Sequence, residues 1–88
     1  MANLYLIDRP YGENGLNLAQ IDPEALVVLV QDGVYFYGQA ATWNVPVYAV
    51  QADLEVRGLE PLVPANIQRI DYSDLVDLIV EHKVINFA

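Results

Sequence analysis

Hydrophobic residues run without a break from Ala25 to Val30, the longest apolar stretch in the chain. Strands that are covered on both faces show such runs, whereas strands with one face in water alternate apolar and polar residues. The stretch ends at Gln31, Asp32 and Gly33, and both Asp and Gly favour tight turns. We therefore predict a central buried strand that carries these three residues to the carboxyl edge of a sheet, where open α/β folds usually meet ligands and partners.

Four other short segments also have the composition of strands. They are rich in branched or aromatic residues, which favour extended structure, and turn residues bound them. The predicted strands are residues 3–8, 46–50, 67–70 and 84–87, the last of them at an edge of the sheet.

Helical periodicity occupies the segments between these strands. Phe36, Ala40 and Trp43 recur at the i, i+4, i+7 spacing of one helix face, which predicts a helix over residues 33–44. A less regular segment is expected to form a short helix around residues 16–21, with Asn14 as its cap.

Two further helices are marked by their ends. A short helix over residues 52–57 is predicted to stop at Gly58, and the last helix to start with Asp71 or Ser73 as its cap. Strands that alternate with helices imply an α/β fold with mostly parallel pairing and helices on both faces of the sheet.

The composition limits the size and setting of this fold. Eighty-eight residues suffice for one domain, here taken as residues 1–88. Apolar residues make up 55% of the chain, which is high for its size, and we interpret the excess as a subunit interface. No apolar run approaches the roughly 18 residues of a membrane span, and the first residues do not resemble a signal peptide. We therefore expect a cytoplasmic protein without a membrane contact.

The charge and the cysteine content exclude several functions. Twelve acidic and four basic residues give a net charge of -8, which argues against direct nucleic-acid binding and fits either a basic partner or simple solubility. The chain has no cysteine, so it can form no disulfide or thiolate metal site and cannot itself carry a persulfide.

The residues around the end of the buried strand have two interpretations each. Asp32 and Gly33 could shape a partner or ligand site, or Asp32 could simply cap the following helix. Asp53 and Arg57 are spaced to pair on one helix, and Arg57 could instead contact a partner.

Aromatic residues are the second set of candidates. Tyr35, Phe36, Tyr37 and Trp43 cannot all face so small a core, and we predict that they contribute to a subunit contact. His82, alone at a helix end, is more consistent with a structural role than with catalysis. We find no nucleophile motif, nucleotide-binding loop, metal-ligand cluster or cofactor motif, and expect neither catalytic residues nor a cofactor.

Four segments together resemble the DsrH/TusB family of small sulfur-relay proteins. They are residues 4–11, 26–34, 47–59 and 70–78, and they span nearly the whole chain in the family's order. The resemblance implies a three-layer α/β/α fold of the DsrE/DsrF/DsrH type with a five-stranded sheet. It also implies a place in a cytoplasmic relay that passes persulfide sulfur between proteins, ending in the TusB branch in 2-thiolation of a tRNA wobble uridine.

Two departures from the family pattern refine this expectation. Family members from sulfur oxidisers carry a cysteine in the first helix, and this chain has none, which favours a TusB-like subunit that is not itself a sulfur carrier. The segment before the buried strand also looks shorter than the family's usual first helix. The resemblance implies DsrE-like and DsrF-like partners in a hetero-oligomer. The alternative is a homo-oligomer that binds a small ligand at the strand-end edge near Asp8 and Asp32.

Overall fold

The computed structural model describes residues 3–9, 11–40, 42 and 45–87, and its centre is a sheet of five parallel strands. The strand order across the sheet is β4-β3-β2-β1-β5. The strands are β1 (Asn3–Ile7), β2 (Ala25–Leu29), β3 (Val47–Val50), β4 (Gln68–Ile70) and β5 (Lys83–Phe87). All four pairings are parallel, as the alternation of strands and helices predicts.

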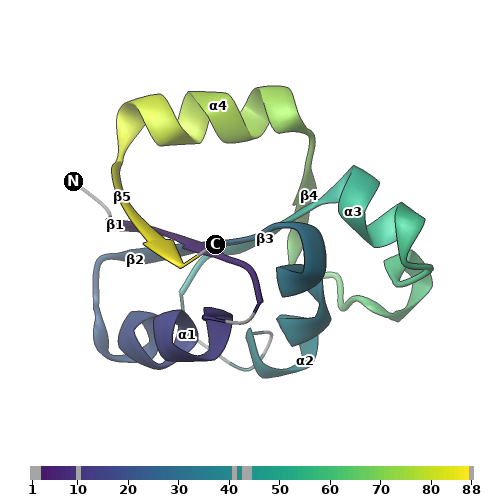
Figure 1. Cartoon of the computed structure of the whole chain (residues 1–88), viewed down its shortest axis with the longest axis horizontal. Coiled ribbons are helices and arrows are strands. Elements are labelled where there is room, and N and C mark those ends of the chain that lie inside the picture. The colour runs from purple at the N-terminus through teal and green to yellow at the C-terminus, as the bar shows by residue number, and fades with distance from the viewer. Residues whose placement is uncertain (1–2, 10, 41, 43–44, 88) are drawn as a thin grey trace.

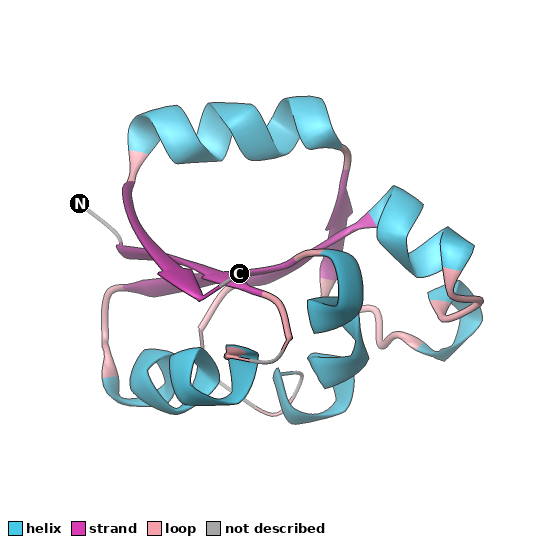
Figure 2. Cartoon of the chain, in the orientation of Figure 1, coloured by secondary structure: helices cyan, strands magenta, loops and turns pink. Residues whose placement is uncertain are grey.

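Helices cover both faces of this sheet, which confirms the predicted three-layer α/β/α fold (Figures 1 and 2). One face carries α1 (Gly12–Ile21), the 3₁₀ helix η1 (Gln31–Phe36) and α2 (Tyr37–Ala40), and the other carries α4 (Tyr72–Glu81). The chain steps in one direction from β1 to β4 and then returns across three strands to β5. Right-handed crossovers therefore place α4 opposite the earlier helices.

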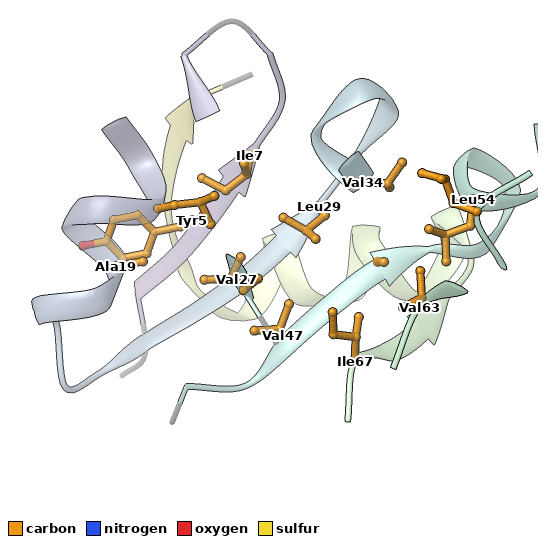
Figure 3. Close-up of a cluster of buried hydrophobic side chains, with 14 of the residues drawn as sticks. Tyr5, Ile7, Ala19, Val27, Leu29, Val34, Val47, Leu54, Val63 and Ile67 are labelled. Carbon is orange, nitrogen blue, oxygen red and sulfur yellow. The ribbon is translucent and has the colours of Figure 1, made fainter. Parts of the chain in front are cut away.

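Strand β2 lies in the middle of the sheet, and all five of its side chains are buried. Val27 and Leu29 belong to the larger core cluster, which faces α1 (Figure 3), and Leu26 and Val28 belong to the smaller cluster under α4. This confirms the prediction of a central strand covered on both sides.

Two predicted helices begin differently in the structure. The first helix starts at Gly12 rather than near residue 16, and Tyr11 is its N-cap residue without a side-chain cap bond, so the prediction that Asn14 caps it is wrong. The predicted helix 33–44 begins instead as the 3₁₀ helix η1 and continues as α2. Its tight first turn arises because the amide of Gly33 donates to the carbonyl oxygen of Val30 at 2.8 Å, only three residues back.

The ends of the two later helices agree with their sequence signals. Helix α3 (Gln51–Val56) is followed by Gly58, whose φ of 67° suits glycine. Asp71 caps α4 in a reciprocal capping box with Asp74. A short 3₁₀ helix, η2 (Glu60–Leu62), leads from α3 toward β4. Within the described residues, none of the helices has both the length and the apolar character needed to cross a membrane.

Gly33 is required by a close approach between η1 and the end of β1. A Cβ atom at this position would overlap the carbonyl oxygen of Ile7 and crowd the backbone of Asp8. By contrast, a Cβ atom added at Gly38 in α2 would meet no atom within 4 Å. The two glycines therefore form a matched pair for testing the fold.

We expect Gly33→Ala to lower the free energy of unfolding by about 1–3 kcal/mol, because the new methyl group can be accommodated only by moving backbone. Gly38→Ala should leave stability unchanged or raise it by up to ~1 kcal/mol, because alanine favours helix. Urea denaturation followed by circular dichroism measures both. Equal stability of the two variants would contradict the packing of η1 against β1.

Candidate functional site

The carboxyl ends of four strands bring charged and aromatic side chains into one group. We call this group the carboxyl-edge cluster and define it by its five polar members. They are Asp8 after β1, Asp32 after β2, Asp53 and Arg57 in and after α3, and Tyr72 at the start of α4. The sequence predicts a functional edge at this end of β2, and the structure adds contributions from the neighbouring strands.

Asp53 links three of these elements. Its side chain is buried at 9% exposure, and its Oδ2 atom accepts hydrogen bonds from the backbone amide of Gln31 at 2.7 Å and the hydroxyl of Tyr72 at 2.8 Å. Gln31 has a φ of 49°, in the left-handed region that non-glycine residues rarely adopt. The buried carboxylate thus secures a strained backbone position at the end of β2.

Arg57 joins α3 to the end of β2. Its Nε and Nη2 atoms lie 3.0 and 2.9 Å from Oδ1 of Asp32, and its Nη1 atom donates to the carbonyl oxygen of Asp53 at 3.1 Å. The predicted i, i+4 pair with Asp53 is also present, at 3.8 Å. The hydrogen bond from Asp32 raises the pKa of Arg57, so the guanidinium stays charged.

Asp32 does not cap the helix that follows it. The N-cap position of η1 is Val30, and no side chain bonds to it there, so the interpretation of Asp32 as a cap is wrong. The carboxylate of Asp8 takes part of that role from a distance, because its Oδ1 accepts from the amide of Gly33 at 3.1 Å. Sequence reasoning missed this contact because the two residues are 25 positions apart.

The aromatic candidates separate in the structure. Tyr35 is 43% exposed, whereas Phe36 and Tyr37 are partly buried and pack against the larger core cluster. Arg9 places its guanidinium carbon 5.2 Å from the ring centre of Tyr35 and 5.9 Å from that of Phe36, which is the range of cation–π contacts. Trp43 lies outside the described residues. A contact role for these rings stays a prediction.

His82 and possible metal ligands lie away from this chemistry. The Nδ1 atom of His82 is 2.8 Å from the carbonyl oxygen of Leu78 in its own helix. Across the part of the chain that the structure describes, no group of three or more histidine, aspartate and glutamate side chains could hold a metal ion.

The carboxyl-edge cluster is a preorganised charged rim. Asp8, Asp32 and Asp53 each accept at least one hydrogen bond within the fold, and Arg57 is held between two of them. Such an arrangement presents fixed charges and backbone to a neighbour. The cluster offers no thiol, since the chain has no cysteine.

Comparisons with known proteins agree with this geometry. A family model described as DsrH like protein matches residues 13–85, which include all of the carboxyl-edge cluster except Asp8. Protein TusB of Photorhabdus laumondii is 33% identical in an alignment that covers 64% of this chain. The alignment covers 66% of that relative, just under two thirds of its length.

The buried carboxylate should matter more for stability than the exposed one. We expect Asp53→Ala to cost about 1–3 kcal/mol, because the amide of Gln31 and the hydroxyl of Tyr72 lose their acceptor. Asp32→Ala should cost less than about 1 kcal/mol, because its ion pair with Arg57 is largely in water. Chemical denaturation compares the two, with Asp53→Asn as the variant that keeps one acceptor oxygen. A larger loss in Asp32→Ala would contradict this ranking.

Tyr72 provides a spectroscopic test of the same contact. Burial, and then the hydrogen bond with the Asp53 carboxylate, raise the pKa of Tyr72 above its ordinary value of 10.0. The folded chain therefore holds this proton more tightly than the unfolded chain, so its contribution to stability is complete below pH 10 and is lost as pH rises through the raised pKa.

We expect the difference in tyrosinate absorbance between the wild-type chain and Tyr72→Phe to titrate above pH 10. In Asp53→Asn the midpoint should shift downward, because the negative charge beside the hydroxyl is removed. A midpoint in the wild-type chain at or below the ordinary value would show that the contact does not form in solution.

Proposed function

The chain belongs to the DsrH-like protein family, and from this premise we propose that it is a sulfur-relay subunit that supports transfer without carrying sulfur. The observation that carries the proposal is the combination of a family match over residues 13–85 with a chain that has no cysteine. Persulfide transfer requires a thiolate on the carrier, so the sulfur must travel on another protein. This chain then contributes through its surfaces and not as an enzyme.

The similarity to a TusB protein indicates which relay is meant. We propose that the chain serves 2-thiolation of a tRNA wobble uridine in the cytoplasm, as the TusB branch of the family does, or a related step of sulfur metabolism. The proposed partners are cysteine-bearing DsrE-like and DsrF-like subunits. Direct tRNA contact is disfavoured by the net charge of -8, because phosphate binding relies on clustered basic residues.

The carboxyl-edge cluster supports a docking role. Its buried hydrogen bonds fix the backbone at the ends of β2 and β4 before any partner arrives, which reduces the ordering cost of association. Arg57 and Asp32 lie at the outer side of this cluster and are its proposed points of contact, together with Tyr35.

A gene deletion with complementation tests the proposed function. In the source organism, loss of the gene should lower the fraction of 2-thiolated wobble uridine, as measured by mass spectrometry of digested tRNA. The wild-type gene should restore it, and the tagged protein should co-purify with DsrE-like and DsrF-like chains. Unchanged thiolation together with purification of this chain as a homo-oligomer would instead favour the ligand-binding alternative.

A further inference from the structure

Helix α4 exposes a continuous line of large apolar side chains. Only Leu75 is buried in this helix, with Leu78 partly buried against the smaller core cluster. Beside them lies what we call the α4 stripe, whose members are exposed at 48%, 57%, 38% and 80%: Tyr72, Val76, Ile79 and Val80. Apolar surface of this extent on a helix commonly marks an interaction site.

Helix geometry makes the α4 stripe a single face. Its members are spaced at i, i+4, i+7 and i+8, so they lie along one side of the helix. The stripe begins at the carboxyl-edge cluster, because the hydroxyl of Tyr72 donates to Asp53. At the other end, Val84 of β5 is 37% exposed and pairs in register with Leu4, a member of the core cluster under α4.

The two faces of the sheet are covered unequally. Helices α1, η1 and α2 lie on one face, and within the described ranges α4 is the only helix on the other (Figure 2). The α4 side of the sheet therefore has room for a further apolar element beside the stripe, and three-layer α/β folds bury such surface against neighbouring elements.

Charge distinguishes the possible occupants. Asp74, Asp77 and Glu81 lie on the remaining, exposed side of α4, and Asp74 and Asp77 line an open groove of about 290 Å³ between this helix and β3–β4. A second copy would bring the same three carboxylates toward this face, in a chain whose net charge is -8. Such like charges oppose self-association, and they favour a partner with basic residues around an apolar centre.

We infer that the α4 stripe is the docking surface for a different relay subunit, one that presents an apolar patch rimmed by lysine or arginine. The inference rests on the proposed function, because it takes the partner to be a DsrE-like or DsrF-like chain. The stripe supplies the apolar centre of the interface, and Asp77 and Glu81 supply the acidic rim.

Paired substitutions on opposite layers test this assignment. In the variant Val76→Asp with Val80→Asp, affinity for the purified partner subunits should fall at least about tenfold, because two apolar contacts are lost at the centre of the interface. The matched control is Leu18→Asp with Ile21→Asp on α1, whose side chains are 47% and 79% exposed on the other layer. Its affinity should stay within about twofold of the wild-type value. Isothermal titration calorimetry measures both, and circular dichroism verifies folding.

A second pair tests the acidic rim alone. Asp77→Asn with Glu81→Gln should weaken binding severalfold and reduce the dependence of affinity on salt concentration, because charges at an interface rim act mainly through long-range attraction. Glu13→Gln on α1 is the control and should change neither quantity.

The outcomes separate this inference from the proposed function. Wild-type binding that the α4 variant loses and the α1 variant keeps would support the docking surface. Wild-type binding that both variants keep, or that both lose while folded, would overturn the α4 assignment and leave the relay function intact. No binding of the wild-type chain to either subunit would overturn both. Homodimers in light scattering that the α4 variant dissociates would overturn the choice of a different partner.

Discussion

The burial of β2 on both faces is the constraint from which the rest of the architecture follows. A strand of five apolar residues needs cover above and below, and a chain of 88 residues has few helices with which to provide it. Three crossovers in one direction place α1, η1 and α2 on one side, and the return from β4 to β5 places α4 on the other. The same arrangement fixes the carboxyl ends of neighbouring strands side by side, which is why residues far apart in sequence meet at one edge.

Local patterns were sufficient to predict the elements of this fold. The apolar run at 25–30 specifies a central strand, Gly58 specifies a helix end, and Asp71 specifies a helix start, because each depends on the backbone within a few residues. The helix predicted over residues 33–44 shows the limit of such patterns. Its first turn is a 3₁₀ turn because Gly33 packs on Ile7 and bonds to Asp8, and neither neighbour is close in sequence.

The candidate site depends even more on contacts between distant residues. The sequence points to Asp32, Gly33 and Arg57, but the residue that joins the elements is Asp53, which sequence reasoning weighed only as a neighbour of Arg57 on one helix. Its buried carboxylate receives a backbone amide 22 residues earlier and a hydroxyl 19 residues later. Parallel strand order could have indicated such a meeting, since all four elements end at one edge. The order itself is not visible in the sequence.

Geometry also explains why α4 leaves apolar surface uncovered. The helix must return from one edge of the sheet to the other, so it runs across the strands (Figure 1). Its 10 residues span about 15 Å, close to the roughly 19 Å between the outer strands of a five-stranded sheet. A helix about 10 Å wide cannot cover the full length of strands that extend about 16 Å. One helix therefore closes the core at Leu75 and leaves its flank open. A polar flank would have sufficed for an isolated chain, and the valines at positions 76 and 80 instead make this side of the sheet suited to a neighbour.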